Sequence, residues 1–313
     1  MSFIGLDLGA TKINAALFSD SGEILTASYH LIGNKKGFEI GLLIQNQINS
    51  LILEAARSGD LLHSLGISVP GIYYSKSGHV WAPNIAGWED YPLLQELETL
   101  LEGRQIKIRI DSDRACSILG EVWKGNAKGC KNAIFMAVGT GIGAGILIDG
   151  QILRGANDIA GCIGWLGIDR PYQEKYTPCG CYEYYASGEG LVRFANEVLR
   201  QNLKYSGVFN DGMELNAINL IREYEAGDEI ALVVIDRAIE YWGMAAANLV
   251  SLFNPEKIIF GGGVFGEAGR FLGRIHQEAR KWAQPIGFTQ VTIEVSACGN
   301  RAGLYGAGYL AIR

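Results

Sequence analysis

Apolar and polar residues along this chain follow two spacings, one typical of strands and one typical of helices. Apolar stretches separated by short polar turns predict three antiparallel strands at residues 3–8, 13–19 and 24–32. Apolar residues at helical spacing then predict a long helix over 37–57. The sequence "LGISVPG" at 65–71 predicts the next buried strand. The first third of the chain is therefore predicted to be a mixed α/β structure.

The same pattern returns in the middle of the chain. The sequence "IFMAVGTGIGAGILIDGQIL" at 134–153 predicts strand, glycine turn, strand, Asp-Gly turn and strand. In the first copy Gly9 precedes Asp20 by eleven positions, and in the second Gly139 precedes Asp149 by ten. Two copies of one β-turn-β-turn-β unit, each followed by helical material, predict a duplicated two-domain α/β fold with a cleft between the domains.

The last part of the chain supplies three more elements. A long apolar helix is predicted over 228–253, followed by a strand in "NPEKIIFGGGV" at 254–264. A final helix over 301–312 carries small residues that would allow close packing: Ala302, Gly303, Gly306, Ala307 and Gly308. We therefore predict an N-terminal domain of residues 1–112 plus 301–313 and a C-terminal domain of residues 113–300.

Composition narrows the class of protein. The 313 residues are 48% hydrophobic and carry a net charge of −6, which suits a globular protein with a substantial core. Lys and Arg form no basic stripe, so nucleic acid is not an expected partner. No apolar stretch is long enough to span a membrane and the N-terminus enters a strand directly, so we expect a cytoplasmic protein. Six cysteines are too sparse for a disulfide scaffold, and thiols are expected.

Candidate chemistry begins at the first hairpin, where the acid Asp7 interrupts an apolar strand and Gly9, Thr11 and Lys12 follow at its tip. Backbone N–H groups in glycine turns form anion-binding concavities. Thr11 and Lys12 would hold terminal phosphate oxygens of ATP, and Asp7 would orient a hydrated Mg²⁺. The structural alternative is a plain tight hairpin.

The second glycine turn, "GTGIGAG" at 139–145, superficially matches a dinucleotide-binding fingerprint. That fingerprint lies between a strand and a helix, whereas β-type sequence flanks this turn on both sides, so we reject it. The matched position of the two turns instead favours a shared phosphate site. The expected phosphate-binding residues of the second copy are Gly139, Thr140, Gly141, Gly261, Gly262 and Gly263.

Several segments together, in order along nearly the whole chain, resemble the ROK family of sugar kinases and sugar-responsive repressors. They are "GLDLGATK", "VPG", "APNIAGW", "SDRACSILGE", "GTGIGAGILIDGQILRGANDIAG", "CGCYEYYASG" and "NPEKIIFGGGV". The resemblance implies an actin-like, hexokinase-like duplicated fold. It also implies ATP-dependent phosphorylation of a sugar hydroxyl with Mg²⁺, and assembly as a homodimer or higher homo-oligomer.

The resemblance assigns roles to individual residues. Asp113 matches the family's catalytic aspartate, which accepts the proton of the attacking hydroxyl; the alternative is that Asp113 caps the following helix. Glu183 matches a sugar-contacting glutamate, and the alternative is a solvated acid at a helix start. Asn84 matches a sugar contact, and the alternative is a turn asparagine.

The sequence departs from the family pattern at three sugar contacts. Ser112 replaces the usual Asn before the base, Cys162 stands where a glutamate is usual, and Trp165 stands where a histidine is usual. We still count Ser112 and Trp165 among the substrate contacts. Trp165 would offer an aromatic face to a pyranose ring or an aglycone, or else would pack in the core. The family's zinc motif is also shortened to Cys179 and Cys181, so structural zinc is not expected.

These residues favour a sugar kinase of altered substrate preference. A non-catalytic sugar or nucleotide sensor is the alternative, because polar sugar contacts are missing. The family's DNA-binding branch is disfavoured, since those members carry an N-terminal helix-turn-helix and only two residues precede the first strand here. A different actin-like ATPase, such as an activator that couples ATP to a metal cluster, is a third possibility.

Overall fold

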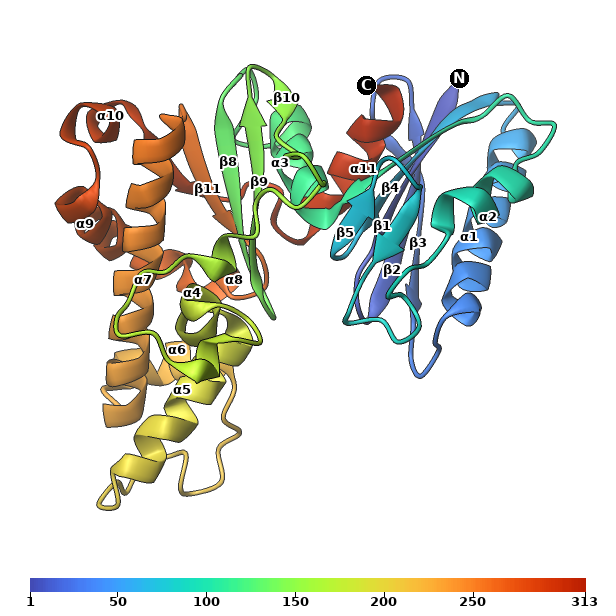
Figure 1. Cartoon of the computed structure of the whole chain (residues 1–313). Helices are drawn as coiled ribbons and strands as arrows, with labels where there is room; N and C mark the ends of the chain where they lie inside the picture. The colour runs from blue at the N-terminus through green and yellow to red at the C-terminus, as the bar shows by residue number, and fades with distance from the viewer. The chain divides into compact units, whose positions relative to one another are not determined.

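The computed structural model describes residues 1–313, which contacts divide into two compact units. Unit 1 comprises Met1–Gly129, Ile152–Ala160 and Asn300–Arg313, and unit 2 comprises Cys130–Gln151 and Gly161–Gly299. Each unit is built around a five-stranded sheet with helices packed on it (Figure 1).

The sheet of unit 1 has the strand order β3-β2-β1-β4-β7. Its strands are β1 (Ser2–Leu8), β2 (Lys12–Ser19), β3 (Ile24–Leu31), β4 (Leu62–Val69) and β7 (Lys107–Ser112). The first three strands are antiparallel, as the sequence predicted, and β4 and β7 continue the sheet in parallel with β1. A separate hairpin is formed by β5 (Ile72–Tyr74) and β6 (His79–Trp81).

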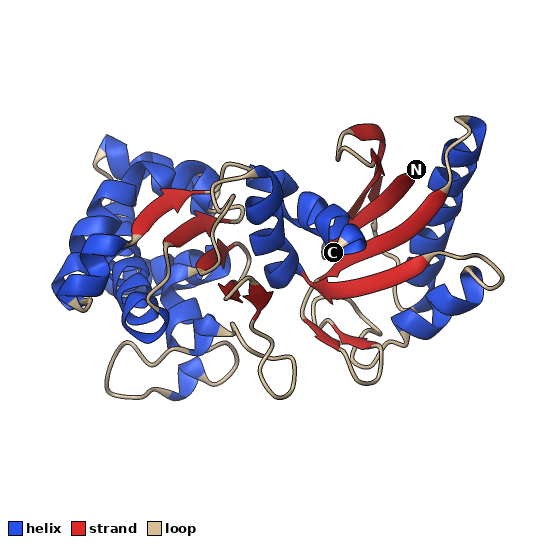
Figure 2. Ribbon diagram, turned by 90° about the horizontal axis from the view of Figure 1, so that it is seen from above, coloured by secondary structure: helices blue, strands red, loops and turns tan.

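Helices cover both faces of this sheet (Figure 2). On one face, α1 (Phe38–Arg57) and α2 (Leu93–Leu100) share an apolar core with the strands. On the other, α11 (Ala302–Ile312) packs on β1 and β4 and lies along α3 (Asp113–Lys124). The small residues of α11 do pack closely, since a Cβ added at Gly306 would stand 1.6 Å from Cys116 O of α3.

The sheet of unit 2 repeats the topology of the first, with the order β10-β9-β8-β11-β12. Its strands are β8 (Ala133–Val138), β9 (Ile142–Ile148), β10 (Gln151–Ile152), β11 (Lys257–Gly261) and β12 (Thr292–Val295). In both units an antiparallel three-stranded meander continues into two parallel strands. The duplication predicted from the two glycine turns is therefore confirmed.

Unit 2 carries more helical material than unit 1. The helices are α4 (Cys181–Ala186), α5 (Gly188–Gln201), α6 (Ala217–Ala226), α7 (Glu229–Phe253), α8 (Phe265–Ala268), α9 (Leu272–Trp282) and α10 (Pro285–Gln290). Four single 3₁₀ turns are η1 (Ile163–Trp165), η2 (Glu174–Tyr176), η3 (Gly269–Phe271) and η4 (Gly299–Arg301). None of the helices in either unit is both long and apolar enough to cross a bilayer.

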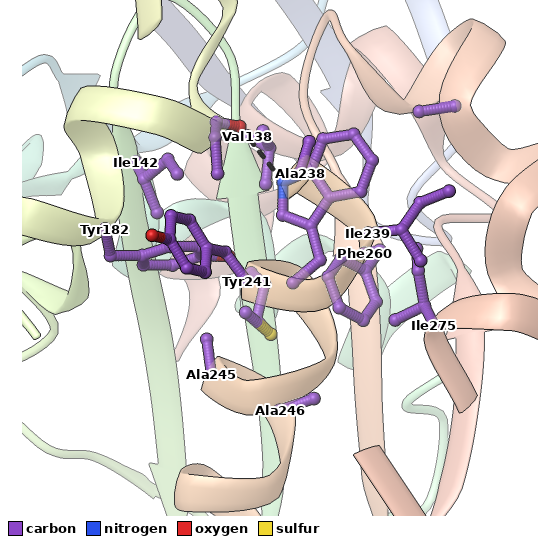
Figure 3. Close-up of a cluster of buried hydrophobic side chains, with 14 of the residues drawn as sticks. Val138, Ile142, Tyr182, Ala238, Ile239, Tyr241, Ala245, Ala246, Phe260 and Ile275 are labelled. Atoms are coloured by element: carbon purple, nitrogen blue, oxygen red, sulfur yellow. Dashed lines mark hydrogen bonds between the residues drawn. The ribbon is translucent and has the colours of Figure 1, made fainter. Parts of the chain in front are cut away.

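The long helix α7 organises the core of unit 2. It begins at Glu229 because Asp228 caps it, with its carboxylate accepting from the backbone N–H of Ile230 and Ala231. Its buried face includes Ala238, Tyr241 and Ala245, which belong to one apolar cluster with Val138 of β8, Ile142 of β9 and Phe260 of β11 (Figure 3). The central helix thereby fixes the sheet against which the second glycine turn is built.

The two units divide the chain differently from the predicted domains. Contacts place α3 and the segment Ile152–Ala160 in unit 1, whereas the prediction assigned both to the C-terminal domain. The reason is packing, since α3 lies along α11. In addition, Arg154 forms an ion pair with Asp111 at 2.6 Å, and Asp158 accepts hydrogen bonds from Ser75.

Candidate active site

Asp7 lies near the end of β1 with its carboxylate against the start of α11. The Ser68 hydroxyl donates to Asp7 Oδ1 at 2.7 Å, and a Cβ added at Gly303 would stand 2.6 Å from the same oxygen. Burial raises the pKa of Asp7, and the Lys12 ammonium acts in the opposite direction. A cation beside this carboxylate would also favour its charged form, and oxygen is the ligand that Mg²⁺ prefers, so Asp7 fits a hydrated Mg²⁺.

No group of three or more acidic, Cys or His side chains is placed to hold a metal ion by itself. The fit to Mg²⁺ therefore depends on Asp7 supplying one ligand while water and phosphate oxygens supply the others, as is usual for this ion at nucleotide sites.

The first hairpin tip is closed by its own backbone. Gly9 N–H donates to Lys12 O at 2.9 Å, and Ile32 N–H donates to Thr11 O at 2.9 Å. Thr11 is exposed, while Lys12 is half-buried, with its ammonium 6.0 Å from the centre of the Tyr29 ring. The tip is a tight hairpin that presents Thr11 to solvent, so the structural alternative and the phosphate-binding prediction are compatible.

Asp113 is the first residue of α3, and the structure corrects the alternative role considered for it. The helix cap is Ser112, whose hydroxyl accepts from Ala115 N–H at 3.3 Å. Asp113 Oδ1 accepts instead from Arg114 N–H at 2.8 Å. The N-cap interpretation of Asp113 is therefore wrong, because the cap lies one residue earlier. The sugar contact expected of Ser112 stays a prediction.

The environment of Asp113 suits a proton acceptor. Burial raises the pKa of Asp113 to about 6, with Arg114 acting to lower it and Asp7 to raise it further. A carboxyl with a pKa near 6 is ionised at neutral pH and is a stronger base than an exposed aspartate. Burial thus makes ionisation of Asp113 cost free energy, and for the same reason it makes the ionised carboxylate a better proton acceptor.

Arg114 is the cation beside this base, and its removal should shift the pH dependence of activity. Its guanidinium donates to Gly71 O at 3.0 Å, which fixes it over the start of α3. The other charged group acting on Asp113 is Asp7, which raises the pKa of Asp113. In Arg114→Ala the acid limb of kcat/KM should move to higher pH by about one unit.

Arg114→Lys is the matched control, because it keeps the positive charge and should leave the acid limb within a few tenths of a unit of wild type. The measurement is kcat/KM from pH 5 to 8 at fixed ionic strength. An unmoved acid limb in Arg114→Ala would show that this guanidinium does not act on the base.

The second glycine turn is held by Glu183. Glu183 Oε2 accepts from Ile142 N–H at 2.6 Å, and a Cβ at Gly141 would stand 2.8 Å from that oxygen. Gly139 N–H donates to Gly141 O at 2.9 Å and Gly139 O accepts from Gly188 N–H at 2.7 Å. Burial raises the pKa of Glu183. The alternative of a solvated helix-start acid is therefore wrong.

The three glycines after β11 differ in what they face. A Cβ at Gly261 would stand 2.2 Å from the Phe135 ring, and one at Gly262, whose φ is +90°, would stand 2.4 Å from Val138 O. Gly263 has no atom within 4 Å of that position and lines a cavity. Gly261 and Gly262 are therefore required by packing, and Gly263 is the glycine open to a ligand.

This cavity lies wholly within unit 2 and has a volume of about 490 Å³. It is lined by Gly139, Thr140, Gly188, Glu189, Val192, Asn216, Ala217, Ile218, Gly263 and Val264. Apolar side chains beside glycine turns and the first residues of α5 and α6 suit a flat heterocycle with phosphates attached. The lining residues from α5 and α6 were not predicted from the sequence, although Asn216, the N-cap of α6, marks where that helix starts.

Asn84 lies in an exposed loop of unit 1 beside a second cavity of about 400 Å³. Lys35, Lys36 and the hairpin-tip residue Ala10 share this cavity. Gly37 N–H donates to Ala86 O at 2.8 Å, which joins the two loops that form it. Asn84 is thus placed near the first hairpin, and its sugar contact stays a prediction.

The residues that depart from the family pattern lie around η1. Trp165 is 58% exposed, so the alternative that it packs in the core is wrong. Cys162 is partly buried and precedes η1. Farther along, Arg193 donates to Cys179 Sγ at 3.6 Å, and Cys181 is buried. All six cysteines are unbridged.

A cluster of tyrosines orders the segment that contains these cysteines. The Lys175 ammonium bonds Glu197 at 3.0 Å and lies within 6 Å of the centres of three tyrosine rings. Those rings belong to Tyr176, Tyr184 and Tyr185. Cation–π contacts and edge-to-face ring packing therefore hold η2 against α4.

The sequence of this chain is similar to those of known sugar kinases and of a sugar-responsive repressor. The model of the ROK family matches residues 3–313. A glucokinase from Halalkalibacterium halodurans is 32% identical over 98% of this chain and 94% of its own length. A xylose repressor from Caldicellulosiruptor bescii is 30% identical over 97% of this chain and 76% of its own length.

The fold of this chain is also similar to solved structures of ROK family kinases. A ROK hexokinase from Thermus thermophilus aligns with a TM-score of 0.83 and 27% identity, covering 100% of this chain and 98% of that one. A ROK family glucokinase from Streptomyces griseus, solved with glucose and AMPPNP, aligns with a TM-score of 0.76 and 27% identity, covering 100% and 99%.

Proposed function

The chain belongs to the ROK family, and on that premise we propose that it is an ATP-dependent sugar kinase with Asp113 as general base. The resemblance and the duplicated actin-like fold predicted from the sequence are both confirmed. The observation that carries the proposal is the neighbouring pair of carboxyls in unit 1. Asp7 sits at a strand end where a cation would stabilise it, and Asp113 has a pKa of about 6.

Unit 1 supplies the groups for the acceptor and for charge neutralisation. Asp113 accepts the proton of the sugar hydroxyl as the hydroxyl oxygen attacks the γ-phosphorus, the bond to the β–γ bridging oxygen breaks and ADP leaves. The ionised state of Asp113 at neutral pH makes this possible. Asp7 would hold Mg²⁺, which supplies neutralisation of phosphate charge when bound. Thr11 and Lys12 would donate to terminal phosphate oxygens. Asn84 and Ser112 would donate to or accept from sugar hydroxyls.

Unit 2 supplies the groups for the nucleotide and part of the sugar site. The adenine ring would occupy the 490 Å³ cavity, with Val192 and Ile218 against its faces. Backbone N–H groups of Thr140, Gly141 and Gly263 would bind phosphate oxygens. Glu183 would accept from a sugar hydroxyl while its second oxygen keeps the glycine turn in place.

The experiment is an ADP-release screen with Mg-ATP and a panel of hexoses, amino sugars and β-glucosides. We expect sugar-dependent ADP release that is absent in Asp113→Asn. If no sugar gives ADP above the level of Asp113→Asn, the kinase proposal fails. A substrate preference different from that of typical members would appear in the same screen.

A regulator is the second candidate, and the similarity to a xylose repressor supports it. In that case sugars or nucleotides would raise the melting temperature of the protein without any turnover. Mg²⁺ dependence, a cytoplasmic location and a homo-oligomeric state stay predictions.

Blocking the nucleotide cavity should weaken ATP binding selectively. Ala217 is the first residue of α6 and lines the cavity. Ala217→Trp should raise KM for ATP at least about tenfold, equivalent to about 1.4 kcal/mol of binding free energy, and leave KM for the sugar unchanged. Ala226→Trp is the matched control, because Ala226 is exposed at the other end of the same helix. Equal KM values for ATP in the two variants would show that the nucleotide does not bind in this cavity.

A further inference from the structure

Asp111 is a buried carboxylate two residues before the general base, and it takes no part in the proposed proton transfer. It lies in β7 and is 3% exposed. The strand register places it opposite Ser68 of β4, which is in turn opposite Asp7 of β1. Asp111 therefore belongs to the same row of the sheet as the candidate Mg²⁺ ligand, at the strand end that leads into Asp113.

Arg154 contacts both oxygens of this carboxylate. Its Nη1 donates to Asp111 Oδ1 at 2.6 Å, and its Nη2 lies 2.6 Å from Oδ2. Burial raises the pKa of Asp111, and the hydrogen bond from Arg154 acts in the opposite direction. A two-point contact between planar groups fixes the orientation of the carboxylate as well as its distance, which a lysine ammonium does not do.

The oriented carboxylate of Asp111 in turn holds the backbone that carries the base. Asp111 Oδ1 also accepts from Ser112 N–H at 2.8 Å. The Ser112 hydroxyl caps α3 by accepting from Ala115 N–H. Ser112 is therefore held at its N–H by Asp111 and at its hydroxyl by the first turn of α3. Because Asp113 follows directly, the direction in which its side chain leaves the backbone depends on the orientation of Asp111.

Arg154 itself belongs to a loop that is anchored on unit 1. Its carbonyl oxygen accepts from Ala160 N–H at 3.0 Å, which closes the loop. The carboxylate of Asp158, four residues after Arg154, accepts from Ser75 N–H at 3.0 Å and from the Ser75 hydroxyl at 3.1 Å. The guanidinium is thus presented to Asp111 from a backbone with little freedom.

Stability alone does not explain the ion pair between Arg154 and Asp111. Taking a carboxylate out of water costs desolvation free energy that a buried partner often only balances, so apolar side chains of the same size would stabilise the fold equally well. Apolar side chains would not hold Ser112 N–H in one direction. The geometry of the backbone before Asp113 is what this pair contributes.

We propose that Arg154 is a positioning residue for the general base, because through Asp111 it sets the orientation of the backbone that carries the Asp113 carboxylate. The inference rests on the proposed kinase function, in which Asp113 takes the proton of the sugar hydroxyl. Arg154 contacts no substrate in this role. Its effect on the rate arises because a base displaced by about 1 Å can lower the rate roughly 10²-fold.

The test begins with Arg154→Ala, which should lower kcat roughly ten- to hundredfold and leave KM for ATP unchanged. The ratio of kcat in H₂O to kcat in D₂O should rise, because proton transfer to a displaced base becomes slower relative to the other steps. Guanidinium chloride below denaturing concentrations should restore part of kcat by binding beside Asp111, and sodium chloride at the same ionic strength should not.

Two further variants keep the test decisive. Arg154→Lys retains the charge, and so the folded state, but loses the two-point contact; its kcat should lie between those of wild type and Arg154→Ala. Arg109→Ala is the matched control on the same strand, because the Arg109 guanidinium donates to Ala311 O at 2.9 Å rather than to Asp111. It should lower the melting temperature and leave kcat and the solvent isotope effect unchanged.

The inference is overturned if Arg154→Ala has the kcat of wild type. It is also overturned if kcat falls with an unchanged solvent isotope effect and no rescue by guanidinium, because a smaller folded fraction would give that result.

A measurement without turnover separates this inference from the proposed function. At pH 8 Asp113→Asn should raise the melting temperature, since it removes a buried charge. In an Arg154→Ala background this gain should be about half as large or smaller, because an Asp113 carboxylate that is no longer held in place can turn toward water. A purely electrostatic action of Arg154 would enlarge the gain, since loss of a cation makes a carboxylate more costly.

An equal or larger gain in the Arg154→Ala background would therefore overturn the inference while the kinase proposal stands. If no sugar is phosphorylated, the proposed function fails, and the comparison of melting temperatures still decides whether Arg154 positions Asp113.

Discussion

Asp113→Asn should abolish sugar-dependent ADP release and at the same time stabilise the folded protein at pH 8. Removing the general base should lower kcat by a factor of about 10² to 10⁴. The gain in stability arises because the ionised carboxylate of Asp113 is partly buried near a second carboxyl, Asp7, and asparagine carries no charge in the same volume.

The pH dependence of this stability follows from the direction of the pKa shift. The pKa of Asp113 rises from 3.8 to about 6 on folding. A raised acid stabilises the folded state fully below the unfolded pKa and loses that contribution as pH rises through the folded value. Wild type therefore becomes less stable than Asp113→Asn between pH 4 and pH 7. After allowance for partial exposure, the difference at pH 8 should be about 1–2 kcal/mol.

Urea unfolding at pH 4 and pH 8 measures this difference directly. Asp113→Asn and wild type should have similar free energies of unfolding at pH 4 and should differ at pH 8. Asp211→Asn is the control, because Asp211 is exposed in unit 2, and it should change neither turnover nor stability. Retained turnover in Asp113→Asn would mean that another group is the general base. A difference in the free energy of unfolding that is the same at pH 4 and pH 8 would show that the Asp113 carboxylate is solvated.

The parts of the fold that the sequence predicted are those with a strong local pattern. The antiparallel meander of each unit is predicted because its apolar strands are separated by turns so short that consecutive strands can only pair antiparallel. The helix α7 is predicted because apolar residues predominate along its 25 positions. Strand β12 has four residues, too few for a period to appear.

The site was predicted less completely, because its geometry comes from contacts between distant segments. Ser68 reaches Asp7 because β4 pairs in parallel with β1 in the register Asp7↔Ser68. Gly303 reaches it because α11 crosses the sheet at that point. No spacing within one segment encodes either contact. The Asp113 role was predicted from a motif, but the helix cap was misplaced by one residue because Ser and Asp both suit that position.

Gly306→Ala should strongly destabilise the folded protein, because glycines allow α11 to pack closely against its neighbours. A Cβ at Gly306 would stand 1.6 Å from Cys116 O, and the same test at Gly66 gives 1.9 Å from Ala307 O. Both obstacles are backbone atoms, which cannot rotate away as side chains do. We expect Gly306→Ala to lower the free energy of unfolding by about 3 kcal/mol, at or above the upper end of ordinary overpacking.

This packing also connects stability to the candidate site, because Cys116 belongs to the helix that begins at Asp113. An added methyl group at Gly306 must push α3 and α11 apart, so kcat should fall even where the variant remains folded. Gly273→Ala is the control, since Gly273 lies in α9 with no atom within 4 Å of the added Cβ and should gain about 0.5–1 kcal/mol of helix stability. A Gly306→Ala variant as stable as wild type in urea would mean that α11 is not seated backbone to backbone on α3.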